Sequence, residues 1–508
     1  MNVFVMVLWA VAVCFVECDS ETVVPSMRPS ADERTWSSTT IDALIADLKP
    51  LLLDPDVAQL LENCLPNTLD TTVHSLTVDP SNGRGVDSFV ITGDITALWL
   101  RDSANQVLPY VPYARNDSRL TQLLQGLVAR HARSVLIDPF ANAFNYNASQ
   151  PPDNHENDVR TPPMTAAVFE GKYEIDSLLA FFKLSYWYVE ETHDTSVLTD
   201  DWLAAADTAL RTVERMMEVG QGVEQPYAFQ RETEVATDTL AISGLGPPGR
   251  PGVGMSRQLF RPSDDAVTFP YNVPGNAMAC VEVGSHLPRL LARLGTDGVP
   301  ALLAARAVRI GETICSAVDA LLQASESPHS ASVPYEVDGY GSQCLMDDAN
   351  VPSLLSLPIL GVAPPHSAAY KKARAFVLST DNPFFFKGTV AEGVGGPHQG
   401  YAMAWPMAIT VRAMTSTDDD EVRECLEMLK RGTAGMGLMH ESFNVNDPYD
   451  YTRDWFAWAN GLFGEMVLQL VHSHPHLVLK PGAGVRGQAL ALVRKPVSLK
   501  SIEEAQRR

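Results

Sequence analysis

Two motifs that lie far apart in the sequence carry carboxylates suited to acid and base chemistry. RPSDDA places Asp264 and Asp265 directly behind Arg261, and MHES places Glu441 beside His440 in a loop. A poorly solvated carboxyl group can stay protonated and act as a general acid, whereas an ionised carboxylate can activate water. Arg261 could hold one aspartate while its neighbour stays protonated, or both aspartates could cap a helix, and spacing alone does not choose between these interpretations.

Two further motifs carry the aromatic and polar side chains that a sugar-binding site needs. In LWLRDSANQ, Trp99 can pack on the C–H face of a sugar ring while Arg101 and Asp102 orient its hydroxyl groups. GGPHQGYAMAWPM presents His398 in a glycine-rich loop and Trp405 within the helical segment that follows. Taken alone, LWLRDSANQ is explained more simply by a helix that Asp102 caps and a salt bridge made by Arg101.

Other acidic residues are candidates for a binding site or a metal site. Glu174 and Asp176 in YEIDS would diverge on a helix, so a solvated helix face explains them more simply. Asp338, Asp347, Asp348 and Asn350 form a cluster that could coordinate a cation such as calcium, but the pattern of an EF-hand loop is absent. The cysteines after the N-terminal apolar run form no CxxC pattern either. The sequence therefore predicts no metal and no other cofactor.

The charge balance restricts the partners of the chain. Its 508 residues include 61 acidic and 38 basic residues, which gives a formal net charge of −23. Nucleic acids and anionic membranes would be repelled by such a surface, so neither is an expected partner. A neutral polyhydroxylated substrate would not be repelled.

Apolar residues recur at helical spacing along most of the chain, for example at Ile41 and Leu44. Later stripes include Tyr401–Met414 and Trp455–Val471, and we assign Trp458 in the last stripe to the aromatic core. Irregular stretches rich in Pro, Gly and Asp separate the stripes, and no β alternation exceeds a few residues. The sequence thus predicts an all-α barrel of about a dozen helices, whose irregular loops and at most short β-strands carry the site.

We expect residues 38–472 to form this barrel and residues 473–508, which are basic and weakly periodic, to form a C-terminal tail. Residues 1–18 contain the apolar run Val3–Val16. This run is shorter than a membrane span of about 20 residues and is typical of a signal peptide. The sequence therefore predicts no stable membrane span and a protein that is secreted or enters the lumen of the secretory pathway.

The wording of the motifs adds a family resemblance. They read, in order, GDITALWLRDSANQVLPY, KYEIDS, FRPSDDA, DDANVPSLLSLP, GGPHQGYAMAWPM and HESFNVNDPYDYTRDWFAWANGLFGE. Between about Cys64 and Val471, this series resembles glycoside hydrolase family 125, the exo-acting α-1,6-mannosidases. The resemblance implies an (α/α)6 barrel that removes non-reducing terminal mannose from an oligosaccharide or glycoprotein glycan. It also implies inversion of configuration and no catalytic metal.

The same resemblance assigns roles to residues of this chain. It places the general base at Glu441 and the general acid at Asp264 or Asp265, with only a slight preference for Asp264. The residues that it implies for the terminal-mannose pocket are Asp94, Trp99, Arg101, Asp102, Glu174, Asp176, Arg261, His398 and Trp405, with Asp338, Asp347 and Asp348 nearby.

Other functions stay open at the level of sequence. One is a non-catalytic protein that binds mannose-containing glycans on the same barrel, and another is an inverting glycosidase specific for glucosides. Loss of the acid or the base would favour the binding protein, but Asp264, Asp265 and Glu441 are all present. A metal-dependent mannosidase is disfavoured because no evident His/Asp ligand set occurs in the sequence.

Overall fold

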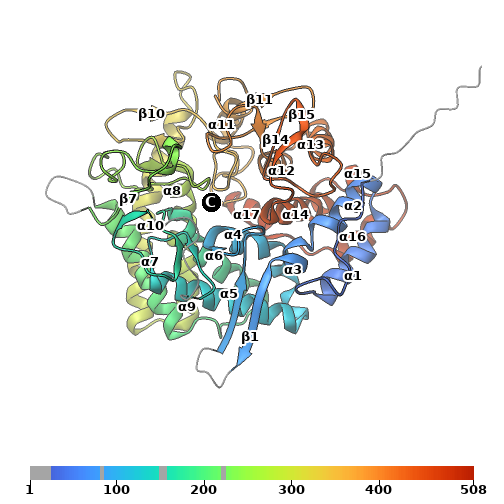
Figure 1. Cartoon of the computed structure of the whole chain (residues 1–508), viewed down its shortest axis with the longest axis horizontal. Helices are drawn as coiled ribbons and strands as arrows, with labels where there is room; N and C mark the ends of the chain where they lie inside the picture. The colour runs from blue at the N-terminus through green and yellow to red at the C-terminus, as the bar shows by residue number, and fades with distance from the viewer. Residues whose placement is uncertain (1–23, 80–84, 148–156, 219–224, 508) are drawn as a thin grey trace, which may run out of the picture.

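The computed structural model describes residues 24–79, 85–147, 157–218 and 225–507. The predicted signal peptide, residues 1–18, lies outside the described residues. Helices predominate, and the β-strands are short (Figure 1). The mostly helical fold class predicted from the sequence is therefore confirmed. Among the described helices, none combines the length and the apolar character that crossing a bilayer requires.

The helices form two layers. The inner layer consists of α4 (Leu100–Val107), α6 (Ile175–Thr192), α8 (Val273–Val281), α12 (Pro406–Met414) and α14 (Ala457–Ser473). These helices are buried along nearly their whole length. They pack in a series, in which α12 contacts α14, α14 contacts α4, α4 contacts α6, and α6 contacts α8. Their loops therefore meet at one end of the inner layer.

The outer layer covers the inner helices with amphipathic helices. It consists of α2 (Pro55–Cys64), α5 (Ser118–Ile137), α7 (Asp200–Met217), α10 (Gly298–Ser325), α11 (Ala368–Val377) and α13 (Asp419–Gly432). The helix α5 begins where the Asp117 side chain accepts hydrogen bonds from the backbone N–H groups of Arg119 and Leu120. A capping carboxylate satisfies N–H groups that have no partner inside the helix. One face of α5 is buried and carries Leu120, Leu124 and Leu127.

Shorter helical segments complete this part of the fold. They are α1 (Thr39–Leu48), η1 (Lys49–Leu51), α3 (Asn67–Thr71), η3 (Leu108–Asn116), η4 (Ala236–Asp238), η5 (Glu282–His286) and α9 (Leu287–Leu294). Two predicted helices begin later than their apolar stripes do. The residues Tyr401–Trp405 precede α12, and Trp455 precedes α14. Trp405 is thus the residue before the helix, not a residue within it.

Short antiparallel sheets lie in the loops. The strands are β1 (Val73–Asp79), β2 (Gly85–Val90), β3 (Leu98–Trp99), β4 (Ala143–Phe144), β5 (Val159–Thr161), β6 (Val168–Glu170), β7 (Ala228–Gln230), β8 (Tyr271–Asn272), β9 (Glu336–Val337), β10 (Gln343–Cys344), β11 (Phe385–Lys387), β12 (Glu392–Val394), β13 (Met403–Ala404), β14 (Ser442–Asn444) and β15 (Asp447–Thr452). In two of the three-stranded sheets, β3-β4-β6 and β13-β14-β15, a candidate site residue lies at one end of a strand or directly beside it. Trp99 ends β3, and Glu441 directly precedes β14.

The sequence predicts a tail for residues 473–508, but the described part of this segment, residues 473–507, is folded against the helical body. It contains α15 (Pro475–Val478), α16 (Val485–Leu492) and α17 (Val497–Ala505), and α17 contacts α14 (Figure 1). The Glu465 carboxylate of α14 accepts a hydrogen bond of 2.9 Å from the backbone N–H of Ser498. Val497 and Ile502 are buried. Apolar burial therefore holds this basic segment in place.

A disulfide between Cys280 of α8 and Cys315 of α10 joins the two layers. The segment η5, which directly follows α8, also approaches α10 closely, because a Cβ atom added to Gly311 of α10 would lie 2.2 Å from the Cα atom of Gly284 in η5. Glycine at both positions permits this approach. The outer helix α10 is thus tied covalently and sterically to an inner helix that begins just after the RPSDDA loop.

Candidate active site

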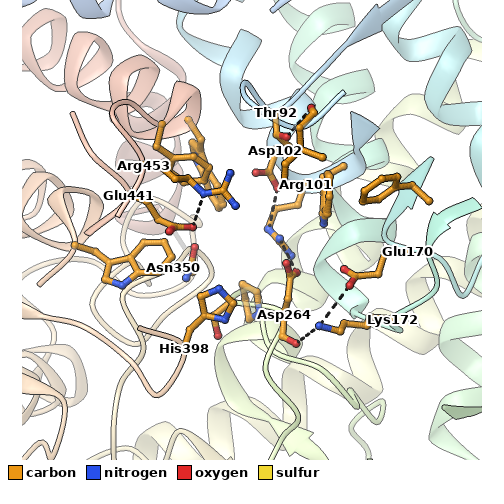
Figure 2. A pocket seen from close by; sticks show the side chains of 18 of the residues that line it. Thr92, Arg101, Asp102, Glu170, Lys172, Asp264, Asn350, His398, Glu441 and Arg453 are labelled. Carbon is orange, nitrogen blue, oxygen red and sulfur yellow. Dashed lines mark hydrogen bonds and ion pairs between the residues drawn. The ribbon is translucent and has the colours of Figure 1, made fainter. Parts of the chain in front are cut away.

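One cavity in the loops brings many of the predicted site residues together (Figure 2). Its volume is about 340 Å³, which lies within the usual range for small-molecule sites. The predicted residues that line it are Trp99, Arg101, Asp102, Asp264, His398, Trp405 and Glu441. The cavity is also lined by residues that the sequence did not assign to the pocket: Thr92, Ile95, Phe169, Glu170, Lys172, Asp238, Pro262, Ser263, Asn350, Arg453, Phe456 and Trp458.

Aromatic pairs supply apolar faces to this cavity. Trp99 lies against Phe169 with ring centroids 5.2 Å apart in an edge-to-face arrangement. Trp405 makes a similar contact with Phe456 at 6.3 Å. Trp458, which the sequence assigned to the core, is 2% exposed and nevertheless lines the cavity. These rings offer the flat apolar surface on which the C–H face of a sugar can pack.

The adjacent carboxylates of RPSDDA point in different directions. The Asp264 side chain lines the cavity and is 24% exposed, whereas the Asp265 side chain is 3% exposed and lies 3.4 Å from the His398 imidazole. The backbone of Asp264 is left-handed, with φ 66°, a conformation that aspartate adopts more readily than most residues. The Lys172 ammonium donates a 2.9 Å hydrogen bond to the Asp264 carbonyl and so holds this turn. The fold therefore presents Asp264, and not Asp265, to the cavity.

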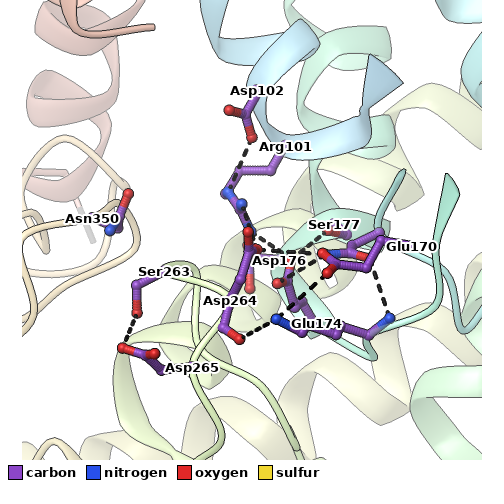
Figure 3. A network of polar contacts seen from close by, with 12 residues as sticks. Arg101, Asp102, Glu170, Glu174, Asp176, Ser177, Ser263, Asp264, Asp265 and Asn350 are labelled. Atoms are coloured by element: carbon purple, nitrogen blue, oxygen red, sulfur yellow. Dashed lines mark hydrogen bonds and ion pairs between the residues drawn. The ribbon is translucent and has the colours of Figure 1, made fainter. Parts of the chain in front are cut away.

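Arg101 connects the cavity to a buried acidic cluster (Figure 3). Its guanidinium lies 3.4 Å from Asp102, 2.5 Å from Glu174, 3.4 Å from Asp176 and 3.2 Å from Asp264. Burial raises the pKa of Asp102 and of Asp176 to about 6, although Arg101 opposes the rise. Burial also raises the pKa of Glu174, against the attraction of Arg101. Glu174 and Asp176 therefore lie behind Arg101 and do not line the cavity itself.

Glu441 lies on the other side of the cavity from Asp264 and Arg101 (Figure 2). The Gln399 amide donates a 2.8 Å hydrogen bond to one carboxylate oxygen of Glu441, and the Arg453 guanidinium lies 3.2 Å from the other. The Arg453 guanidinium also forms an ion pair with the Asp94 carboxylate. Asp94 is thus placed beside the site through Arg453 and is not a lining residue. The two contacts fix the orientation of the Glu441 carboxylate.

His398 carries a positive charge next to the carboxylates. Burial lowers the pKa of His398. A hydrogen bond to Asp265 and the charges of Asp265, Glu441 and Asp264 outweigh this effect and raise the pKa to about 9. The imidazole is therefore protonated at neutral pH and can donate from both nitrogens. Such a group can bind an oxygen of a substrate that enters the cavity.

Several predicted pocket residues support the site without lining it. Arg261 forms a buried ion pair of 2.6 Å with Glu336. Asp348 accepts a 2.8 Å hydrogen bond from the Ser263 hydroxyl. Asp347 accepts hydrogen bonds from the backbone N–H groups of the turn that begins at residue 354. The prediction that Arg261 lines the pocket is wrong, because Glu336 holds its guanidinium away from the cavity.

Asp338 lies outside the site altogether. Its carboxylate accepts hydrogen bonds from the backbone N–H groups of Tyr340, Gly341 and Ser342 in an exposed loop. Asp347 and Asp348 are bound to other backbone and side-chain groups, so the three aspartates do not converge on a cation site. In the described ranges, no group of three or more His, Cys, Asp or Glu side chains is arranged to hold a metal ion.

Some lining residues were missed from the sequence for different reasons. Lys172 directly precedes Tyr173 in the KYEIDS motif, so the motif itself was the available signal. Glu170 and Asp238 have no distinctive neighbours, and only the fold brings them to Lys172, which lies 3.5 Å and 2.5 Å from them. Trp458 has the helical spacing of a core residue, so nothing in the sequence indicated that its side chain also lines the cavity.

Paired carboxylates beside aromatic faces, an arginine and a charged histidine define the site of a glycoside hydrolase. Comparison with known proteins specifies the family. Residues 54–468 match the metal-independent α-mannosidases of glycoside hydrolase family 125. The chain therefore belongs to this family, as its motifs indicated, and it is an α-mannosidase by family.

Two relatives show how far the similarity extends. The chain is 43% identical over 476 residues to the Meiotically up-regulated gene 157 protein of Schizosaccharomyces pombe, and the alignment covers 90% of each chain. It is 35% identical, with a TM-score of 0.76, to a metal-independent α-mannosidase of Streptococcus pneumoniae solved in a non-productive complex with α-1,6-mannobiose. That match covers 84% of this chain and 96% of the streptococcal chain.

The charge on His398 generates a titration prediction. The His398 imidazole should lose its proton as the pH rises through about 9, far above its ordinary pKa of 6.5. Asp265→Asn removes the carboxylate nearest to this imidazole, so the His398 midpoint should fall. Nuclear magnetic resonance of the histidine ring protons measures both midpoints.

Asp419→Asn is the matched control, because Asp419 pairs with the exposed His476 at 2.7 Å and neither residue lines the cavity. This variant should leave the His398 midpoint unchanged. A wild-type midpoint near 6.5, or equal midpoints in wild type and Asp265→Asn, would contradict the assignment of charge.

Proposed function

We propose that this chain is an inverting exo-α-1,6-mannosidase that hydrolyses non-reducing terminal mannose from glycans without a catalytic metal. The observation that carries the proposal is the placement of Asp264 and Glu441 at different sides of one cavity lined by aromatic rings. Membership of the metal-independent α-mannosidase family supports the reaction class. The similar streptococcal enzyme, whose structure holds α-1,6-mannobiose, supports the linkage.

In the proposed mechanism, Asp264 is the general acid and Glu441 is the general base. Asp264 protonates the leaving oxygen while Glu441 takes a proton from a water that attacks the anomeric carbon on the opposite face. Such a single displacement inverts the anomeric centre and requires carboxyl groups about 6.5–9.5 Å apart. Gln399 and Arg453 support the role of Glu441, because they orient its carboxylate toward the cavity.

The remaining lining groups are proposed to bind the terminal mannose. Trp99 and Trp405 offer faces to the apolar side of the ring, while Arg101, Asp102 and His398 orient its hydroxyl groups. The buried acidic cluster behind Arg101 blocks the cavity on that side. A chain terminus fits such a cavity better than a chain interior, which supports exo action.

We further propose that the two helical layers are the inner and outer rings of an (α/α)6 barrel. The neighbouring contacts of α12, α14, α4, α6 and α8 support this arrangement. The buried segment 349–361, which forms turns and not a regular helix, lies between α10 and α11 in sequence and would supply the remaining inner position.

The alternative functions are less well supported. A binding-only protein would not need a carboxylate at each side of the cavity, with one of them oriented by an amide and a guanidinium. A glucoside-specific enzyme would share the same carboxylates, so the choice of sugar depends on the assay described below.

We also propose that the chain enters the secretory pathway. The apolar run Val3–Val16 supports this location. A disulfide such as Cys280–Cys315 is typical of oxidising compartments, which adds independent support. A mannose-containing glycoprotein glycan would be available there as the substrate.

The substrate proposal is tested with mannobioses of different linkage. The chain should release mannose from α-1,6-mannobiose faster than from the α-1,2 and α-1,3 isomers, and it should act poorly on α-1,6-linked glucose. Exhaustive chelation should leave the rate unchanged, because neither carboxylate role needs a metal. Loss of activity with EDTA and its recovery with calcium or zinc would contradict the metal-free mechanism.

The catalytic assignment is tested with isosteric variants. Glu441→Gln should lower turnover of α-1,6-mannobiose by about 10²-fold or more, because it removes the general base. Asp264→Asn should slow mannobiose hydrolysis far more than hydrolysis of α-mannosyl fluoride, whose leaving group needs little protonation. Nuclear magnetic resonance of the first-formed sugar should show β-mannose.

Asp265→Asn is the matched control for the acid, because it is the adjacent aspartate but does not line the cavity. It should show no such dependence on the leaving group. First-formed α-mannose, or near wild-type turnover by Glu441→Gln, would show that the assigned roles are wrong.

The secretory proposal is tested by expressing the full chain in a eukaryotic host. Mass spectrometry of the product should find an N-terminus that lacks Val3–Val16 and a peptide pair linked through Cys280 and Cys315. A cytosolic product that retains Met1 would contradict this location.

A further inference from the structure

Four carboxyl groups surround one guanidinium on the buried side of the cavity. Asp102, Glu174, Asp176 and Asp264 all lie within 3.4 Å of Arg101. The side chains of Glu174 and Asp176 are 0% exposed, and among the described residues only Arg101 forms an ion pair with either of them. Three of these carboxyl groups are buried and the fourth, Asp264, is mostly buried, so leaving all four ionised around one guanidinium is costly. A proton held by one of the carboxyl groups would lower this cost.

Glu174 and Asp264 are the two carboxyl groups placed to share such a proton (Figure 3). Both contact the Arg101 guanidinium and the Asn142 amide, so their oxygens lie next to each other, and two carboxyl groups can form a hydrogen bond only when one is protonated. The Arg101 guanidinium bridges them at 2.5 Å and 3.2 Å. The Asn142 amide also lies close to both, at 3.2 Å from Glu174 and 3.4 Å from Asp264.

We propose that Glu174 and Asp264 share a single proton, and that Glu174 is a positioning residue that keeps this proton available to the general acid at neutral pH. The proposal rests on the proposed function, in which Asp264 is the acid. Glu174 does not touch the substrate, because Arg101 and Asp264 separate it from the cavity.

The electrostatics explain why Asp264 needs such a partner. Burial raises the pKa of Asp264, but the charge of Arg101 and a hydrogen bond from Glu174 together lower it below its ordinary value. An isolated aspartate in this state would be ionised and could not protonate a leaving oxygen. The pKa of Glu174, in contrast, is raised by burial and by the neighbouring acids. The pair therefore retains the proton that Asp264 alone would lose.

The proton passes through the pair in a balanced sequence. The O–H bond of Glu174 breaks as one forms on Asp264, and that second O–H bond breaks as the leaving oxygen takes the proton. Glu441 gains the proton lost by the attacking water, whose hydroxyl forms the new bond to the anomeric carbon. Afterwards Glu441 releases a proton to solvent, and the Glu174–Asp264 pair takes one back.

Other charged groups around the pair influence when this proton is lost. Those facing Glu174 or Asp264 are Arg101 and Asp102 from α4, Asp176 from α6, Lys172 from the segment before α6, and His398 from its loop. The loss of the shared proton should define the alkaline limb of the pH profile of kcat/KM, because that limb reports the essential acid of the free enzyme.

The test is Glu174→Gln, which preserves the shape and the hydrogen-bond donor but cannot hold the proton. Asp264 then loses the negative partner that disfavours its own ionised form, so its proton is lost at lower pH. The alkaline limb of kcat/KM for α-1,6-mannobiose should move to lower pH by about one unit or more. The rate at neutral pH should fall by about 10- to 100-fold, whereas the rate for α-mannosyl fluoride should fall much less.

Asp176→Asn is the matched control. It removes a second buried carboxylate that lies 3.4 Å from the same guanidinium, but Asp176 is not among the carboxyl groups that the Asn142 amide contacts in the described residues, namely Glu170, Glu174 and Asp264. If Asp176→Asn reproduces both the shift and the dependence on the leaving group, the effect is one of general charge and the proposal is overturned. An unchanged alkaline limb in Glu174→Gln overturns it as well.

Further measurements separate the shared-proton proposal from the proposed mannosidase activity and from a failure of the variant to fold. Hydrolysis of α-mannosyl fluoride by Glu174→Gln shows that the variant is folded, and wild-type hydrolysis of α-1,6-mannobiose tests the proposed function by itself. Infrared difference spectra of wild type and Glu174→Gln should show one protonated carboxyl group that is missing from the variant at neutral pH. Absence of this signal from wild type overturns the shared proton even if the variant fails to fold.

Discussion

The site depends on the contact between one guanidinium and the carboxylates packed around it. Arg101 lies 2.5 Å from Glu174 and 3.2 Å from Asp264 in a region that is almost closed to water. Removing a charged partner from such a region leaves the other charge buried and unpaired, which is far less favourable than losing an exposed ion pair. Arg101 therefore fixes the position of Asp264 and sets the protonation of the acids behind it.

Short β-structure positions the other side of the cavity within a mostly helical protein. Glu441 directly precedes β14, and its backbone N–H donates to the carbonyl of Thr452 in β15. The His440 imidazole stacks on Tyr451 with ring centroids 3.8 Å apart. Arg453 then follows β15 and returns to the Glu441 carboxylate. Pairing of two adjacent strands thus places a carboxylate and its guanidinium partner together with little freedom.

The helix α14 connects the cavity to the C-terminal segment. Trp458, near its beginning, lines the cavity, while Glu465, two turns later, accepts a hydrogen bond from Ser498 at the start of α17. Burial of both side chains makes α14 a rigid element between the substrate cavity and the last helix. The segment that follows residue 473 is in this way part of the support of the site.

The sequence by itself determined the helical class, the family and the motifs that carry the chemistry. Helical spacing of apolar residues indicates amphipathic helices wherever they occur, and strings such as FRPSDDA are specific enough to identify relatives. Short-range chemistry also identified Arg101 and Glu441 as functional candidates. These features depend on residues close together in the chain, so a linear pattern can reveal them.

Only the tertiary structure decided which of these residues share a surface. Asp264 and Asp265 are adjacent in sequence, yet a left-handed turn presents one to the cavity and buries the other. Arg261 has a favourable position in its motif, but Glu336, which is remote in sequence, withdraws it from the cavity. Glu174, whose simplest reading was a solvated helix face, is fully buried. Side-chain direction and burial depend on contacts between distant segments, and a linear pattern does not contain those contacts.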